Sequence, residues 1–484
     1  MIRQTHLSSS KEAGESQRFS RRHMLTNTSA GFGMLALGGL CGGFSERLAL
    51  ADEVADSNGN LTGPLAPRTP HFSSQAKRVI FLCMSGGPSH LDTFDYKPQL
   101  ERDHGKTGKY GGKLLKSPWQ FRQHGQSGLW ISDLFSNTAK FADDLCLIRS
   151  MQCDQPVHPG AMTQMHTGTA QFIRPSIGAW TLYGLGTENQ NLPGFVSLSP
   201  PPSSSRNYGS AFLPAIYGGT KVGRSERGNR FGRDREDVSI PDIKHRSLNQ
   251  SQQRKQLNFI QDLNREKLKR EAFQPEVEGL IESYELAFRM QSAMPEVMDL
   301  SNETQATRQM YGVDDATTAT FGKQCLLARK FVETGVRFVE VTHGNWDQHV
   351  NLKADHQARA DACDKPIAAL LKDLKQRDLL DDTLVIWGGE FGRTPAAQGA
   401  DGRNHNNRGY TIWMAGGGVK GGFNYGATDE HGYEAVDSPC HIHDWHATVL
   451  HLLGLDHQKL TYRYAGRDFR LTDVHGNVLH EIIA

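Results

Sequence analysis

Histidines and carboxylates gather in short segments of this chain, and each of these segments follows a run of apolar residues. Trp-Asp-Gln-His supplies Asp347 and His349, Gly-Glu-Phe-Gly-Arg-Thr-Pro supplies Glu390, and Gly-Arg-Asn-His supplies His405. Mixed imidazole and carboxylate ligands suit divalent cations such as Zn²⁺, Mn²⁺ or Ca²⁺. We therefore predict a divalent metal ion held by Asp347, His349 and His405, with Glu390 nearby as a further ligand candidate.

A further segment, Ser-Gly-Gly-Pro-Ser-His-Leu-Asp, adds His90 and Asp92 as candidate metal ligands. Taken singly, none of these groups is specific. A pair such as Asp347 and His349 is as often a solvated loop as a metal site, and His405 alone is as often an ordinary loop histidine. The combination of several such segments is what favours a metal site.

Two arginines and one histidine are the candidates for handling a substrate. A guanidinium can hold a phosphate or sulfate group through two parallel hydrogen bonds, so Arg393 and Arg403 are predicted to bind an anion. His158 precedes Pro159, which suits the first turn of a helix. An imidazole near neutral pH can attack, move a proton or bind metal. These roles stay open for His158, beside the alternative that it only caps the helix.

Short apolar runs rich in β-branched residues predict strands that end just before these segments. They cover residues 78–84, 145–149, 336–342, 383–387 and 410–415. Helical spacing is found over 322–333 and 354–377. Continuous apolar strands that alternate with helices predict an α/β fold, with a mostly parallel central sheet and helices on both faces. Ligands bind such sheets beyond the carboxyl ends of the strands, where these segments should meet.

The N-terminal region has the pattern of an export signal. Arg21 and Arg22 form a twin-arginine pair, a weakly apolar segment follows, and Ala49-Leu50-Ala51 provides an A-x-A cleavage site. We predict a twin-arginine signal peptide over 1–51 and a periplasmic or extracellular location. The alternative is a cytosolic tail that contains Arg-Arg by chance.

Beyond the signal, the sequence predicts a polar linker over 52–76 and one main domain over 77–484. This domain carries a loop and helical insertion at about 199–310. Within the insertion, residues 245–300 are highly charged and show apolar residues at i, i+3 and i+4 spacing. This spacing predicts two or three amphipathic helices outside the sheet.

Composition excludes several classes of protein. With 54 Lys and Arg against 53 Asp and Glu, the net charge of +1 excludes a generally basic nucleic-acid binder. No stretch of about 18 uncharged apolar residues is present, so we expect no stable membrane span in the mature chain. Cys83 and Cys146 lie inside apolar runs and are predicted to be buried thiols.

Several motifs resemble a secreted, uncharacterised bacterial "domain of unknown function" family. They are the Ser-Gly-Gly-Pro-Ser-His-Leu-Asp-Thr-Phe-Asp block, the Trp-Asp-Gln-His block, Gly-Glu-Phe-Gly-Arg-Thr-Pro with Gly-Arg-Asn-His, and the tail from His443 to Asp473. The resemblance covers roughly residues 70–484. That family is similar to the alkaline phosphatase/sulfatase superfamily, which implies an alkaline phosphatase/sulfatase-like fold and metal-dependent hydrolysis.

The resemblance also implies roles for individual residues. The superfamily places its Ser, Thr or modified Cys nucleophile ten residues before the Gly of a Thr-Gly pair, and that position here is His158. Asp347 and His349 resemble the carboxylate–histidine pair of one metal site, and His405 resembles its later histidine. Glu390 stands where a carboxylate of a second metal site is expected.

Departures from the superfamily leave more than one function open. Met162 replaces the Arg of the sulfatase signature, Ser85 replaces the usual Asp, and Phe391 replaces a metal-binding His. A formylglycine sulfatase is therefore not expected. The leading hypothesis is an exported metal-dependent hydrolase of phosphate or sulfate esters, acting on a small-molecule or polysaccharide anionic ester. The alternatives are a non-catalytic exported metal- or anion-binding protein and a phosphomutase-like isomerase.

Overall fold

The computed structural model describes residues 63–201, 204–223, 240, 243, 247–270 and 275–484. The predicted signal peptide over 1–51 lies outside the described residues, as does the linker up to residue 62. Export and the domain boundaries therefore remain predictions. Leu61–Ala484 forms one compact unit, which holds all the elements below.

A nine-stranded sheet runs through this unit in the order β12-β4-β11-β8-β1-β7-β5-β6, with β15 also paired to β4. Its strands are β1 (Arg78–Met84), β4 (Leu145–Gln152), β5 (Phe195–Leu198), β6 (Thr220–Val222), β7 (Phe338–His343), β8 (Thr383–Gly388), β11 (Tyr410–Ala415), β12 (Phe423–Tyr425) and β15 (Cys440–His441). All pairings are parallel except those of β11, which is antiparallel to β4 and β8. The predicted α/β class with a mostly parallel sheet is confirmed.

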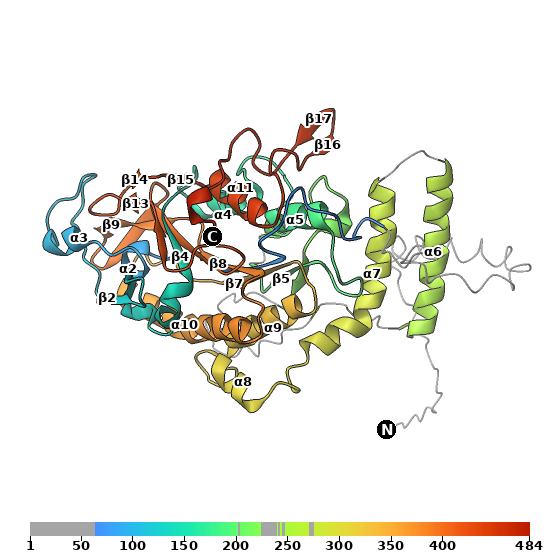
Figure 1. Ribbon diagram of the computed structural model, residues 1–484, viewed down its shortest axis with the longest axis horizontal. Coiled ribbons are helices and arrows are strands. Elements are labelled where there is room, and N and C mark those ends of the chain that lie inside the picture. The colour runs from blue at the N-terminus through green and yellow to red at the C-terminus, as the bar shows by residue number, and fades with distance from the viewer. Residues whose placement is uncertain (1–62, 202–203, 224–239, 241–242, 244–246, 271–274) are drawn as a thin grey trace, which may run out of the picture. The chain divides into compact units, whose positions relative to one another are not determined.

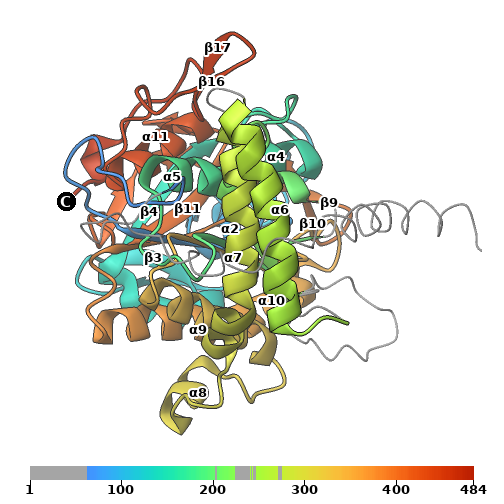
Figure 2. The same cartoon turned by 90° about the vertical axis from the view of Figure 1, so that its right-hand side faces the viewer.

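Helices cover both faces of the sheet (Figures 1 and 2). One face carries α4 (His158–Thr167), α5 (Ile177–Leu185) and α11 (Ile442–Leu452). The other carries α9 (Ala319–Glu333) and α10 (Leu352–Gln376), the two helices expected from sequence spacing. Central strands β7 and β8 are buried along their whole length, which explains the nearly continuous apolar sequence of β8.

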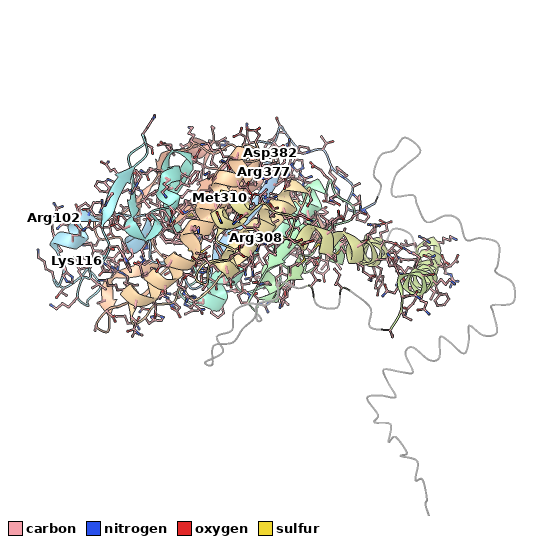
Figure 3. The ribbon with its side chains drawn as sticks, turned by 90° about the horizontal axis from the view of Figure 1, so that it is seen from below. Arg102, Lys116, Arg308, Met310, Arg377 and Asp382 are labelled. Carbon is pink, nitrogen blue, oxygen red and sulfur yellow. The ribbon has the colours of Figure 1, made fainter. Side chains whose placement is uncertain are left out.

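Of the next three helices, the first two lie in the region 245–300 that was expected to be helical, and the third follows it. They are α6 (Gln250–Arg270), α7 (Pro275–Met298) and α8 (Gln305–Tyr311). α6 and α7 pack side by side, and Arg254 of α6 donates two hydrogen bonds of 2.7 and 2.8 Å to Glu285 of α7. α7 also packs on α9, and α8 packs on α9 and α10, where Figure 3 shows Arg308 and Met310 on the same side as Arg377. No described residue between β6 and β7 belongs to a strand of the sheet.

Smaller elements complete the described chain. The short helices are α2 (His90–Thr93), α3 (Pro98–Arg102), η1 (Asp133–Phe135), η2 (Thr138–Asp144), η3 (Ser205–Asn207), η4 (Ala215–Tyr217) and η5 (His480–Ile482). The remaining strands form two-stranded ribbons: β2 (Phe121–His124) with β3 (Leu129–Ser132), β9 (Gly392–Gln398) with β10 (Gly402–Asn406), β13 (Ala427–Thr428) with β14 (Ala435–Asp437), and β16 (Tyr462–Tyr464) with β17 (Arg467–Phe469). The β9–β10 ribbon directly follows β8 and carries part of the site.

Two further observations concern the cysteines and the length of the helices. The cysteines of the described chain are all free and buried, as expected for Cys83 and Cys146. Across the described ranges, no helix combines the length and the apolar character needed to cross a membrane.

Candidate metal centre

The carboxyl ends of β1, β4, β7 and β8 lie at one edge of the sheet, because these strands run parallel. The loop after β7 carries Asp347 and His349. Glu390 lies in the short connection between β8 and β9, and His405 lies on β10. α4 begins at His158, with Pro159 in its first turn. The structure brings four of these side chains together: the ligand atoms of His158, Asp347, His349 and His405 all lie within 4.8 Å of one another.

One carboxylate oxygen, Oδ1 of Asp347, lies close to all three histidines of this group. Asp347 Oδ1 lies 2.9 Å from His349 Nε2, 3.1 Å from His158 Nε2 and 3.3 Å from His405 Nε2. The same oxygen accepts a hydrogen bond of 2.7 Å from Arg393 Nη2. Three imidazole nitrogens from three separate segments therefore converge on a single acceptor.

The second nitrogen of each ring is already engaged with an acceptor. His158 Nδ1 lies 2.6 Å from Glu390 Oε1, and His349 Nδ1 lies 2.6 Å from Gln398 Oε1. His405 Nδ1 lies 2.9 Å from the carbonyl oxygen of Pro156. Because these oxygens accept hydrogen bonds, each Nδ1 can donate to its partner, and Nε2 is the nitrogen of each ring that faces Asp347. Metal-binding histidines have this arrangement, with the outer nitrogen donating to a carboxylate or carbonyl.

The electrostatics of the group favour positive charge between the rings and the carboxylate. Burial alone would lower the pKa of His158, but the hydrogen bonds and charges of Asp347 and Glu390 raise it to about 9. Burial would raise the pKa of Asp347, yet hydrogen bonds from His158, His405 and Arg393 hold it well below its usual range. His158 and Asp347 therefore stabilise each other's charged forms.

Close backbone approaches fix the loops that carry the ligands. Gly86 has φ +110°, and a Cβ there would stand 2.7 Å from the backbone nitrogen of Trp346 and 2.9 Å from that of Asp347. Its N–H donates to Glu390 Oε1 over 3.0 Å. At Gly402, a Cβ would stand 1.8 Å from the carbonyl oxygen of His349. Glycine is required at both positions because only a residue without a side chain lets the loops come this close.

The predicted anion-binding residue Arg393 has a different environment from the one expected. Its guanidinium is fully buried and donates to Asp347, to the carbonyl of Gly87 at 2.8 Å, and to the carbonyl of Gly86. Every one of these partners belongs to a loop of the site. Arg393 therefore positions Asp347 and the loop after β1, and its donors are directed at the protein instead of at a ligand.

Arg403, Asp92 and His90 are not brought to the group that converges on Asp347. Arg403 Nε donates to Asp92 Oδ2 over 2.8 Å, and both side chains are fully buried. His90 Nε2 donates to the carbonyl of Gly432 over 3.1 Å, and burial lowers its pKa to about 4. In the structure, Arg403 and Asp92 form an internal ion pair and His90 is a neutral buried histidine, so we assign them structural roles.

Three residues near the group were missed by the sequence reasoning. Gln398 holds His349 in place, whereas Arg206 and Asn345 line a pocket of about 700 Å³ together with His158 and Asp347. Arg206 follows β5, whose carboxyl end lies at the same edge of the sheet. The place of Arg206 after a strand was the one signal that could have identified it as a candidate, because the surrounding loop has no recognisable motif.

Comparison with known proteins identifies the family. The sequence matches the family described as "Protein of unknown function (DUF1501)" over residues 76–483. The chain belongs to the DUF1501 family. The family of unknown function expected from the motifs is thereby confirmed. No curated protein matches the sequence.

Solved structures similar to this DUF1501 chain include sulfatases and an alkaline phosphatase. "Ps i-CgsB in complex with k-i-k-neocarrahexaose" has 12% identity over 78% of this chain and 72% of that chain, with a TM-score of 0.37. PsFucS1 sulfatase from Pseudoalteromonas sp. has 14% identity over 80% and 68%, with a TM-score of 0.33. A mutant of TAB5 alkaline phosphatase with Mg bound has 12% identity over 79% and 99%, with a TM-score of 0.34.

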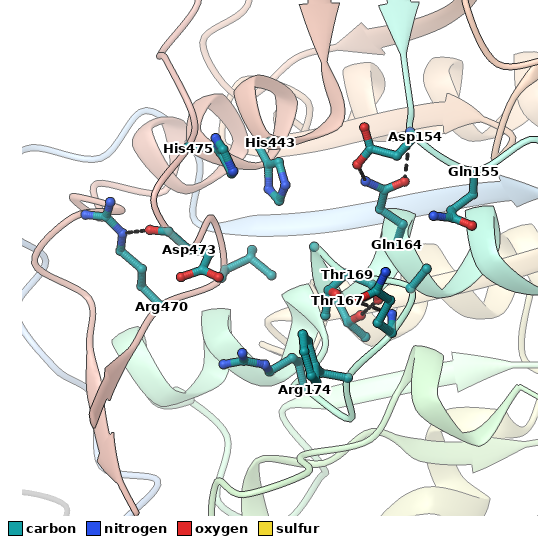
Figure 4. A pocket seen from close by; sticks show the side chains of 15 residues that line it. Asp154, Gln155, Gln164, Thr167, Thr169, Arg174, His443, Arg470, Asp473 and His475 are labelled. Carbon is teal, nitrogen blue, oxygen red and sulfur yellow. Dashed lines mark hydrogen bonds between the residues drawn. The ribbon is translucent and has the colours of Figure 1, made fainter. Parts of the chain in front are cut away.

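A second pocket of about 340 Å³ adjoins the first one, and Ala170 lines both. Figure 4 shows His443 beside His475 on one wall of this pocket, with Arg470 and Arg174 on the opposite part of its lining. The two histidine rings stack with their centroids 5.1 Å apart. Two arginines and two aspartates, Asp154 and Asp473, thus line this pocket of the DUF1501 chain.

Gln398 offers a test of whether the centre holds a metal ion. Replacing Gln398 with Leu removes the acceptor for His349 Nδ1 and frees the ring to turn away from Asp347. We expect metal affinity to fall by about 10- to 100-fold, the usual effect of losing such an outer partner. Calorimetric titration of the metal-free protein measures this change. Gln123→Leu, on the surface strand β2, is the matched control and should bind metal as the wild type does. Equal affinities in both variants would contradict the assignment.

Proposed function

We propose that this protein is an exported, metal-dependent hydrolase of phosphate or sulfate esters. The observation that carries the proposal is the convergence of three Nε2 atoms on Asp347 Oδ1, while all three Nδ1 atoms have acceptor partners. Nitrogen ligands favour Zn²⁺ or Mn²⁺ over Ca²⁺, which prefers a shell of oxygen atoms.

The residues present fit an ion with an open coordination position. In the proposal, Asp347, His349 and His405 hold the ion, and three protein ligands are typical of catalytic sites. A bound divalent ion polarises an ester oxygen and lowers the pKa of coordinated water. Arg393 keeps Asp347 in position by its hydrogen bond of 2.7 Å.

His158 is proposed to move a proton during ester cleavage. Its Nδ1 is tied to buried Glu390, so Nε2, which faces Asp347, is the nitrogen left to move a proton. Such a carboxylate–histidine pair fixes the orientation of the ring and stabilises its protonated form. Arg206, which is exposed and lines the same pocket, is proposed to contact the anionic group of a small-molecule or polysaccharide ester.

Turnover of a panel of chromogenic phosphate and sulfate esters tests the proposed activity. We expect the metal-loaded protein to hydrolyse at least one class, a chelator to abolish that activity, and the divalent ion to restore it. The matched control is His124→Ala on β2, a histidine outside the centre, which should leave turnover unchanged. Metal binding without turnover of any ester would contradict the hydrolase and support the non-catalytic binding protein.

Export is proposed from the twin-arginine pair. Replacing Arg21 and Arg22 with lysine is expected to leave the uncleaved precursor in the cytoplasm, because the export receptor reads the arginine pair. Fractionation of cells followed by immunoblotting measures the distribution. Replacing Arg3 with lysine leaves the pair intact and serves as the control. Normal export of the doubly substituted chain would refute the twin-arginine route.

A further inference from the structure

A second group of metal-ligand side chains lies inside the protein, away from the pocket. Cys83 of β1, His166 of α4 and Glu340 of β7 place Sγ, an imidazole nitrogen and a carboxylate oxygen within 4.8 Å of one another. Their exposed fractions are 1%, 0% and 1%. His166 lies eight residues beyond His158 on the same helix, about 12 Å along its axis. We propose that these three residues bind a structural zinc ion, a function separate from the proposed hydrolase centre.

The hydrogen bonding of His166 leaves one nitrogen free for a ligand. Its Nδ1 lies 2.8 Å from the carbonyl oxygen of Met162 and therefore carries the hydrogen. Its Nε2 is the ring nitrogen that faces Glu340, and this atom has no hydrogen-bond partner. A backbone carbonyl on the outer nitrogen is the usual support of a metal-binding histidine.

The spacing between His166 and Glu340 matches two ligands of one ion. Nε2 and Glu340 Oε2 are 3.5 Å apart, and Oε2 likewise has no hydrogen-bond partner. A charge-assisted hydrogen bond would bring the two atoms to about 2.7–2.9 Å. Ligand atoms at about 2.0–2.2 Å from a tetrahedral Zn²⁺ stand about 3.4 Å from each other. The observed separation therefore fits an ion shared by both atoms better than a direct hydrogen bond.

Charge and ligand type favour zinc over a hard cation. The thiolate of Cys83 and the carboxylate of Glu340 together neutralise a divalent ion, so the buried site carries no net charge. A thiolate selects thiophilic metals such as zinc over magnesium or calcium. Burial and the charge of Glu340 raise the pKa of the Cys83 thiol, so metal binding displaces the thiol proton to solvent.

Neighbouring groups supply candidates for the fourth coordination position. Met162 Sδ lies 3.9 Å from Cys83 Sγ. Ser197 of β5 is the register partner of Glu340, so both side chains emerge on the same face of the sheet, and the buried Ser197 hydroxyl has no hydrogen-bond partner. The interior around Glu340 thus holds three buried polar atoms without a hydrogen-bond partner: Nε2 of His166, Oε2 of Glu340 and Oγ of Ser197.

Cobalt substitution tests this site without using activity. The chain is produced in defined medium with Co²⁺ in place of Zn²⁺, so that the ion is available while the sealed site folds. A thiolate bound to Co²⁺ gives a near-ultraviolet charge-transfer band. The proposed hydrolase centre contains no cysteine, so this band cannot come from that centre. We expect the band in the wild type and in Asp347→Asn, which removes the hydrolase centre.

Cysteine variants test whether Cys83 binds the proposed ion. Cys83→Ser is expected to lose the band and one equivalent of metal, whereas Cys146→Ser, also at a buried free cysteine, should keep both. A folded wild-type protein without the band, or a band that survives Cys83→Ser, would overturn the proposal. Should Cys83→Ser fail to fold, zinc X-ray absorption of Asp347→Asn decides: one sulfur at about 2.3 Å supports the site, and no sulfur refutes it.

Discussion

Replacing Asp347 with asparagine is expected to remove the ion from the candidate metal centre and to lower ester hydrolysis by about 10³-fold or more. Asp347 is the carboxylate that faces Nε2 of His158, His349 and His405. An amide removes the negative charge that balances the ion, and a lost ion forfeits several kcal/mol of transition-state stabilisation. Metal analysis and kcat/KM of the purified variant measure both effects.

His158→Ala is the informative companion to this variant. If His158 moves a proton and the other three residues hold the ion, the alanine variant keeps its metal and loses about 10²- to 10⁴-fold in kcat. Loss of the metal in His158→Ala would instead make His158 a ligand. An Asp347→Asn protein with full metal content and full activity would contradict the proposed centre as a whole. Circular dichroism of both variants controls for folding.

Replacing Arg403 with methionine is expected to destabilise the fold by about 3–5 kcal/mol. The change leaves the Asp92 carboxylate fully buried without its guanidinium partner at 2.8 Å. Removing one partner of a buried ion pair costs this much because the remaining charge has lost both water and its counterion. Urea denaturation followed by circular dichroism measures the change in the free energy of unfolding.

A surface ion pair provides the control for this prediction. Arg463 contacts Asp468 over 3.1 Å, but their side chains are 66% and 56% exposed. Arg463→Met should change the free energy of unfolding by about 0–1 kcal/mol, as is usual for exposed pairs. Adding Asp92→Asn to Arg403→Met should recover part of the loss, since no buried charge then remains. Equal stabilities of Arg403→Met and wild type would contradict the structural role of Arg403.

Much of the fold follows from local sequence patterns. The apolar runs at 78–84 and 410–415 are strands β1 and β11 with the predicted bounds, because buried parallel sheets need continuous apolar strands. The direction of β11 could not be predicted. β11 is antiparallel to both of its neighbours, β4 and β8. The direction of a strand depends on the path of the connecting loops, and no short sequence pattern indicates that path.

The site could be predicted only in part, for a similar reason. His158, Asp347, His349 and His405 were found because each ends or follows a recognisable segment at the same edge of the sheet. The role of Arg393 depends on Asp347, 46 residues earlier in the chain, and that pairing is visible only in three dimensions. The guanidinium of Arg393 therefore suggests anion binding in the sequence, although in the fold it donates to Asp347 and to the carbonyl of Gly87.

The same limit applies to the proposed zinc site. Cys83, His166 and Glu340 come from three elements that lie far apart in the sequence. No spacing motif joins them, so only the packing of α4 on β1 and β7 brings their ligand atoms together.

The location of a metal ion in a crystal of this protein tests the central claim most directly. Anomalous diffraction collected above and below the absorption edge of the bound metal identifies the ion and places it. The account predicts an anomalous peak between the Asp347 carboxylate and the Nε2 atoms of His349 and His405, with an open position toward the pocket. Crystals grown with saturating Zn²⁺ or Mn²⁺ that show no peak there, with the imidazoles bonded directly to Asp347, would contradict it.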